Sequence, residues 1–103
     1  MATQRFDDAE RWLAQAIHRE PASAKAHLLM AQVLEARGDK ERAIPELRAS
    51  LWLKEDTAVR LRLSQLYLSL LRPQEAEMQA RKILELEPGN QAAKDILARV
   101  GKP

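Results

Sequence analysis

Apolar side chains recur at intervals of three and four residues along most of this chain, which is the spacing of one face of an α-helix. Residues that begin or end helices, mainly Gly, Pro, Ser, Asp and Asn, separate these stretches. The pattern predicts six helices, over about residues 5–18, 24–37, 40–54, 57–70, 73–86 and 91–100. We therefore expect an all-α fold.

Small polar residues stand where several of these helices begin, and such side chains can accept hydrogen bonds from the N–H groups of a first turn. Gly38 is placed to end the second helix in a left-handed conformation, and Pro73 suits the first position of the fifth. Pro45, early in the third helix, removes one hydrogen bond and predicts a bend. The N-cap candidates are Ser23, Asp39 and Asn90, with Asp56 or Thr57 for the fourth helix.

Alanines mark a period along the chain. Ala9 and Ala43 are 34 residues apart, and Ala43 and Ala76 are 33 apart. Pro21 and Pro88 are separated by 67 residues, the same interval as Ala9 and Ala76. A fixed period of this length indicates one helix–turn–helix unit that is repeated and stacked on its neighbours.

The spaced residues resemble the tetratricopeptide repeat (TPR), a 34-residue helix–turn–helix unit. In that family, positions 8 and 20 are small, so that the two helices of a repeat approach closely. Ala31 and Ala43 hold these positions in one repeat, and Ser64 and Ala76 hold them in the next. The resemblance implies a right-handed α-solenoid of antiparallel helix pairs. A single array over 1–103 would divide into the second helix of a partial repeat, two full repeats and a capping or partial-repeat helix, at 1–22, 23–56, 57–90 and 91–103.

In TPR arrays the first helix of each repeat lines a concave groove, and the resemblance carries this role to the matching positions here. Gln32 and Gln65 hold the same position in consecutive repeats, and two amides in a row could bond the backbone of an extended peptide. The alternative is that both are merely exposed polar residues. The groove residues are Lys25, Leu28, Gln32, Glu35 and Ala36, then Ala58, Leu61, Gln65, Leu68 and Ser69, and finally Ala92, Asp95 and Arg99.

One kind of groove is disfavoured by these residues. Members of the family that clamp a terminal carboxylate resemble each other in carrying Lys at position 5 and Asn at position 9. Leu28 and Gln32 stand there in this chain. A clamp for a chaperone tail is therefore not expected.

The first predicted helix has an apolar face of its own, with Phe6, Ala9, Leu13, Ala16 and Ile17 at helical spacing. In a TPR array it would lack the helix that pairs with it. Part of this face, including Leu13, Ile17 and Trp12, would then be an uncovered end interface, and Trp52 is a further surface candidate. Either the chain is cut from a longer array, which a start in mid-repeat favours, or this end pairs with a second copy.

Composition removes several classes of function. The net charge is +2 with acids and bases interleaved, and there is no basic run, so nucleic acid is not an expected partner. The absence of cysteine excludes disulfides and thiolate metal sites. No apolar run has transmembrane length and no signal peptide is visible, so we expect no membrane insertion. The expected location is cytoplasmic, or periplasmic if the chain is cut from a longer exported protein.

Catalytic chemistry is not visible in the sequence. His18 and His27 are the only histidines, and they fall on different helices without metal-ligand spacing, so we expect one to be exposed and the other to fill a core position. Asp7 and Asp8 point apart on their helix and are expected to be solvated. We therefore predict no enzyme, no metal and no cofactor. The predicted function is a non-catalytic protein–protein interaction module that binds a peptide or helix in its groove, as a fragment of a larger scaffold. The alternative is a structural spacer or a dimerising segment with contacts at the array ends.

Overall fold

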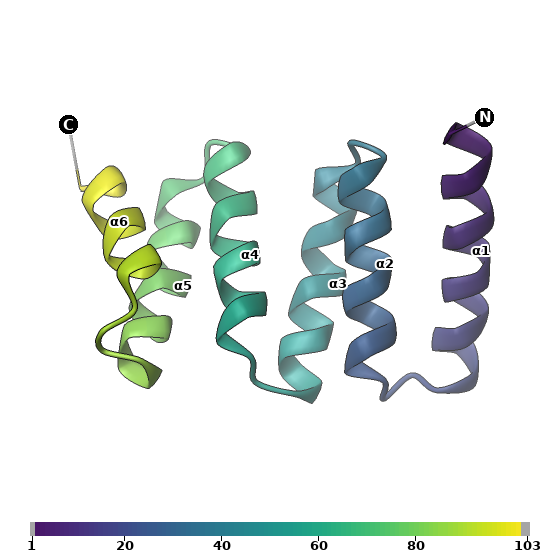
Figure 1. Ribbon diagram of the computed structural model, residues 1–103, viewed down its shortest axis with the longest axis horizontal. Helices are drawn as coiled ribbons and strands as arrows, with labels where there is room; N and C mark the ends of the chain where they lie inside the picture. Colours follow the sequence, from purple (N-terminus) through teal and green to yellow (C-terminus); the bar gives the residue numbers. More distant parts are fainter. Residues whose placement is uncertain (1, 102–103) are drawn as a thin grey trace. The chain divides into compact units, whose positions relative to one another are not determined.

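The computed structural model describes residues 2–101, with side chains from residue 4 onward. Its helices confirm the predicted all-α class, and no strand occurs among these residues (Figure 1). Each predicted helix is present, with ends that differ from the expected ones by three residues at most. In chain order they are α1 (Ala2–Arg19), α2 (Ala24–Ala36), α3 (Lys40–Leu53), α4 (Thr57–Ser69), α5 (Pro73–Leu86) and α6 (Gln91–Val100).

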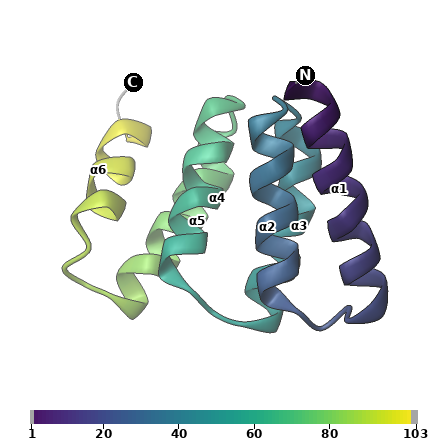
Figure 2. The same cartoon turned by 45° about the vertical axis from the view of Figure 1, so that its right-hand side comes forward.

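The described residues form two compact units, one up to residue 55 and the other from residue 56 onward. In the first unit α2 packs against both α1 and α3, and α1 runs alongside α2 (Figures 1 and 2). Ala31 on α2 and Ala43 on α3 have no exposed surface. Because alanine adds only a methyl group, the two helices can pack closely at these positions, with Leu34 and Leu47 completing the core.

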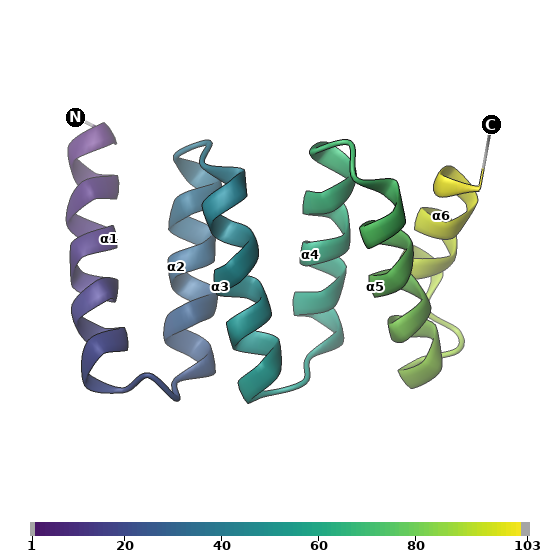
Figure 3. The same ribbon diagram turned by 180° about the vertical axis from the view of Figure 1, so that it is seen from behind.

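In the second unit α5 packs against both α4 and α6, as Figure 3 shows from behind. Ser64 on α4 is fully buried, and its hydroxyl donates a hydrogen bond of 2.8 Å to the backbone carbonyl of Ala76 on α5. The two small positions of this helix pair are therefore in direct contact. The bond satisfies a hydroxyl that would otherwise be buried without a partner.

Three of the predicted N-caps are present. Ser23 accepts a hydrogen bond from the N–H of Ala26, and Asn90 accepts one from that of Ala93. Asp56, not Thr57, caps α4, because its carboxylate accepts from the N–H of Ala58 at 2.9 Å. The first turn of each of these helices thereby gains a partner for one otherwise unpaired donor.

Asp39 corrects one detail of the sequence analysis. It stands at the N-cap of α3, but its side chain makes no capping bond. Its carboxylate instead accepts from Arg42 at 3.2 Å, one turn further along the helix. The preceding turn has the expected geometry, since Gly38 has a φ of +86° in the left-handed region. Pro45 lies inside α3 on its exposed side.

The predicted apolar face of α1 is confirmed only in part. Phe6, Leu13 and Ile17 are half-buried, whereas Ala16 is exposed. The physical reason is the width of the contact, because α2, the helix against which α1 packs, covers only one side of α1. His27 fills a nearly buried position, as expected of one histidine, and His18 is exposed.

Candidate functional site

The predicted groove residues of the first unit all lie on α2. Leu28, Gln32 and Glu35 are half-buried and follow one another at intervals of four and three residues, which places them on one side of the helix. Lys25 and Ala36, at the two ends of this row, are exposed. Along this side of α2, the aliphatic side chain of Leu28 and the amide of Gln32 therefore lie between two charged residues, Lys25 and Glu35.

The second unit carries its predicted groove residues on two helices, α4 and α6, which contact each other. On α4, Leu61 and Leu68 are half-buried while Gln65 is exposed between them. Ala58 and Ser69 are exposed at the two ends of this row, and on α6 Ala92 is half-buried while Asp95 and Arg99 are exposed.

Two polar members of this set are engaged within their own helices. The Ser69 hydroxyl donates to the carbonyl of Leu66 at 2.7 Å. The Asp95 carboxylate accepts from the amide of Gln91 at 2.8 Å. The amide of Gln65 is exposed on α4 between the half-buried side chains of Leu61 and Leu68. Partly covered leucines with amides among them suit a peptide that offers both apolar side chains and backbone groups.

The residues predicted for the end interface separate into two groups. Trp12 is 73% exposed. Leu13 and Ile17, in contrast, are half-buried on the side of α1 that packs against α2. The exposed surface at this end is therefore centred on Trp12. Trp52, on α3, is even more accessible, with 90% of its surface exposed.

An ion-pair cluster that the sequence analysis missed fastens α1 to its unit. Arg37, just after α2, donates to Asp7 and to Glu10 on α1, the latter at 3.1 Å. Arg42 on α3 reaches the other oxygen of Glu10 at 2.8 Å. These partners are about 30 residues apart, so no helical spacing could have indicated them.

Both ring nitrogens of His27 lie within hydrogen-bond distance of oxygen atoms of the protein. Its Nδ1 lies 3.0 Å from a carboxylate oxygen of Glu46 on α3, and its Nε2 lies 3.0 Å from the carbonyl oxygen of Pro21. Only 13% of the side chain is exposed. The ring therefore links the α1–α2 loop, α2 and α3, which is a structural use and leaves neither nitrogen open to a ligand.

Hydrogen bonds shift the pKa of Glu87 and the pKa of Arg42. Bonds from Thr57 and Asn90 stabilise the charged form of Glu87 and lower the pKa of its carboxyl group. Bonds to Glu10 and Asp39 raise the pKa of Arg42. Neither group lies in the predicted groove, so both shifts belong to structural contacts.

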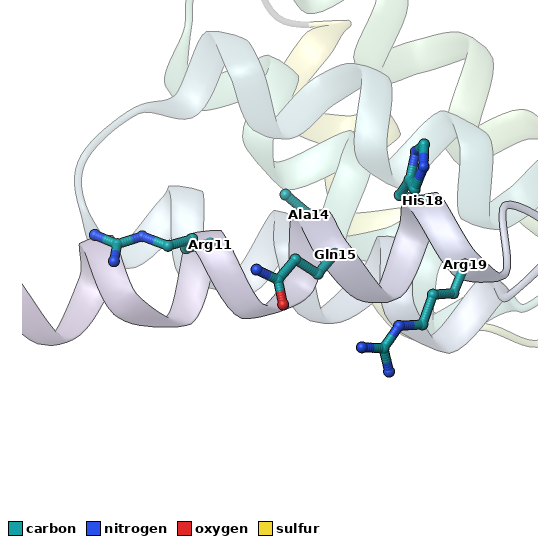
Figure 4. A pocket seen from close by; sticks show the side chains of 5 residues that line it. All are labelled: Arg11, Ala14, Gln15, His18 and Arg19. Atoms are coloured by element: carbon teal, nitrogen blue, oxygen red, sulfur yellow. The ribbon is translucent and has the colours of Figure 1, made fainter.

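No other chemistry is evident in the described part of the chain. Residues 4–101 contain no group of three His, Asp or Glu side chains placed to hold a metal ion. None of the helices within residues 2–101 is long and apolar enough to cross a membrane. A shallow hollow does lie on the surface of α1 (Figure 4), lined by Arg11, Ala14, Gln15, His18 and Arg19.

Comparison with known proteins identifies the family. The sequence pattern of the tetratricopeptide repeat matches residues 1–51. TTC0263, described as a thermophilic TPR protein of Thermus thermophilus, is 28% identical, with a TM-score of 0.79 over 95% of this chain and 50% of that one. The TPR domain of P58(IPK) is 30% identical, with a TM-score of 0.74 over 96% of this chain and 28% of that one. Residues 1–51 belong to the tetratricopeptide repeat family, and the chain as a whole has the fold of TPR proteins.

A third structure shows the same fold in a peptide complex. It is the second TPR domain of human RPAP3 bound to an HSP70 peptide, 20% identical, with a TM-score of 0.80 over 98% of this chain and 85% of that one. The chain spans half the length of TTC0263 and just over a quarter of the P58(IPK) structure. No curated protein sequence matches it. The solved structures thus share the helix–turn–helix repeat fold with this chain.

Proposed function

We propose that the predicted groove residues bind a peptide or a helix of a partner protein, and that the chain contributes no catalysis. These residues form the groove face of α2 in the first unit and the groove faces of α4 and α6 in the second. The observation that carries the proposal is the shared composition of the two rows. Leu28 and Gln32 on α2 correspond to Leu61 and Gln65 on α4, with the same spacing and with leucines that stay partly accessible. The leucine can contact an apolar side chain of the peptide while the neighbouring amide forms a hydrogen bond with the peptide's backbone.

Peptide complexes of similar folds support the class of ligand. RPAP3 is bound to an HSP70 peptide, and the type III secretion chaperone SycD of Yersinia enterocolitica is bound to a peptide of the translocator YopD. At 20% and 16% identity these proteins share the fold with this chain, and their partners do not transfer to it. They support the proposal that a helix array of this fold can bind a peptide segment of another protein.

The residues favour a peptide that is recognised along its length over one that is held by its terminal carboxylate. Leu28 and Leu61 offer no positive charge at the position where carboxylate-clamping relatives carry Lys. We expect the peptide SGPTIEEVD, which RPAP3 binds, to show no measurable affinity for this chain. Isothermal titration with that peptide checks this point.

The test of the proposal uses peptides selected by the protein itself. A random-peptide phage library is panned against the purified chain, and the strongest peptides are synthesised and measured by fluorescence anisotropy. Replacing Gln32 and Gln65 together with Ala should weaken binding by about tenfold or more, because two hydrogen bonds to the peptide are lost. The far-UV circular dichroism and the melting temperature should stay nearly unchanged, since neither side chain is buried.

A matched control uses two exposed glutamines that are not groove residues, Gln4 on α1 and Gln74 on α5. The Gln4→Ala/Gln74→Ala variant has the same composition change outside the groove faces and should bind like the original chain. Equal affinities for the groove variant and the original chain would reject the groove as the binding surface.

A further inference from the structure

The outward side of α1 carries four exposed residues in a row. Asp8, Trp12, Gln15 and Arg19 are separated by four, three and four positions, so they lie along one side of the helix. The same alternation separates the a and d positions that meet in paired helices. We call these four residues the outer row of α1. The spacing places the four side chains where a second helix could contact them together.

The contacts with the other helices of the unit leave this row uncovered, and within α1 the Asp8 carboxylate lies 3.9 Å from the guanidinium group of Arg11. Leu13 and Ile17 are the half-buried residues on the α2 side of α1. Asp7 and Glu10 also face that side, because both accept hydrogen bonds from Arg37. The outer row uses none of these residues, so a second neighbour could pack against α1 without displacing α2.

The charges of the outer row are complementary to the same row running in the opposite direction. In an antiparallel pair centred between Leu13 and Ala14, Asp8 of each copy lies opposite Arg19 of the other. The two-fold axis makes this ion pair twice. Trp12 of each copy then lies beside Gln15 of the other. A parallel pair would instead bring Asp8 against Asp8 and Arg19 against Arg19, which is repulsive.

The surface next to the row also permits a close approach. The hollow of Figure 4 lies along it, and Gln15 and Arg19 belong both to the row and to the lining of the hollow. Ala14 and Ala16, on either side of Gln15, are exposed and small. Small side chains at these positions allow the large ring of a neighbouring Trp12 to pack against the helix.

We propose that α1 pairs antiparallel with α1 of a second copy of the chain through the outer row, with Trp12 as the apolar contact and Asp8–Arg19 as the two symmetric ion pairs. The proposal does not depend on the groove. A single helix pair buries less surface than the roughly 1,200–2,000 Å² of stable complexes, so the dimer should be weak. We expect a dissociation constant on the order of 100 µM.

Sedimentation equilibrium between about 10 µM and 1 mM tests this. The chain should move from monomer toward dimer over that range. Trp12→Ala should raise the dissociation constant by at least about tenfold, because the large apolar side chain at the contact is lost. Trp52→Ala is the matched control, since Trp52 is at least as exposed but lies on α3, outside the row. It should leave the dissociation constant unchanged.

Charge reversal tests the direction and register of the pair. Asp8→Arg alone sets two arginines opposite each other, as Arg19→Asp alone sets two aspartates, and each should weaken the dimer about tenfold. The double variant Asp8→Arg/Arg19→Asp restores opposite charges and should dimerise like the original chain. Circular dichroism should show that each variant is folded, because both side chains are exposed.

Three results would overturn the proposal. One is a chain that stays monomeric up to 1 mM, which would leave the outer row to some other occupant or to solvent. Another is equal weakening by Trp12→Ala and Trp52→Ala. The third is a double charge reversal that stays as weak as the single reversals, which would exclude the antiparallel register.

Discussion

Leu71 has a φ of +60°, in the same left-handed region in which Gly38 lies at +86°. The two residues stand at the same point of equivalent turns, between α4 and α5 and between α2 and α3. The hydrogen bonds also correspond, because the N–H of Asp39 reaches the carbonyl of Leu34 and that of Arg72 reaches the carbonyl of Tyr67, both at 2.8 Å. The second turn thus places a leucine where the first uses glycine.

Replacing Leu71 with Gly should therefore stabilise the protein. A left-handed conformation costs a residue with a Cβ about 1–2 kcal/mol, while the greater freedom of glycine in the unfolded chain offsets part of the gain. Leu71 is 88% exposed, so its removal forfeits little packing. We expect a net gain of about 0.5–1 kcal/mol in urea denaturation.

The reciprocal variant is Gly38→Ala. Nothing lies within 4 Å of a Cβ built on Gly38, so only the backbone conformation opposes the change. We expect a loss of about 1 kcal/mol. A gain on Gly38→Ala, or a loss on Leu71→Gly, would contradict this interpretation of the two turns.

Ser64 should tolerate a smaller side chain far better than a larger one. Ser64→Ala removes the hydrogen bond to Ala76 and should lower the free energy of unfolding by about 0.5–1.5 kcal/mol. Ser64→Leu forces a much larger side chain between α4 and α5 and should cost more, on the order of 3 kcal/mol. Urea denaturation of both variants gives the order, and a Leu variant as stable as the Ala variant would contradict close packing at this contact.

The cluster around Glu10 should control how firmly α1 is held. The Arg37 side chain is 29% exposed and bonds two carboxylates of α1, so Arg37→Gln removes the charge from both contacts. Amide hydrogen exchange in α1 should become about fivefold faster, while exchange in α3 should change little. Arg48, an exposed arginine on α3, provides a control as Arg48→Gln. Equal effects of the two variants on α1 would mean that the cluster does not hold the helix.

Glu87 should make stability depend on pH. Its pKa in the folded chain is lowered by the Thr57 and Asn90 bonds, so its contribution is fully present above the carboxyl group's ordinary pKa and disappears as pH falls through the lowered value. Thr57→Val removes the hydrogen bond that lowers the pKa of Glu87 most. The original chain should exceed this variant in stability at pH 7, and the difference should shrink by pH 3. A difference that grows on acidification would have the wrong sign, and NMR titration of the Glu87 carboxyl carbon follows the pKa directly.

Much of the fold was predictable because its determinants are local or periodic. The close helix contacts at Ala43 and Ala76 could be predicted from the period of the repeat alone. The capping roles of Ser23 and Asn90 could be predicted from their place just before a helix. Asp39 shows the limit of such local rules, because its carboxylate binds Arg42 in place of the N–H groups of the first turn. Leu71 could not have been predicted either, because residues other than glycine seldom adopt a left-handed conformation and leucine is not among those that favour it.

The candidate site was less accessible to sequence analysis. Which groove residues bind a ligand depends on a partner that the sequence does not encode, so those residues stay predictions, as does the division into repeats at 1–22, 23–56, 57–90 and 91–103. The cytoplasmic location likewise stays a prediction. Long-range contacts such as Arg37 with Glu10 depend on the helices being in place first, and no spacing along the chain indicates them.

The most direct test of the peptide-binding account is an NMR titration of the isotopically labelled chain with a peptide selected from the random library. The account predicts that shifts of backbone and side-chain amides concentrate on the groove faces, with the side-chain amides of Gln32 and Gln65 among the largest. Shifts confined to α1, α3 and α5, with both of those amides unmoved, would contradict it.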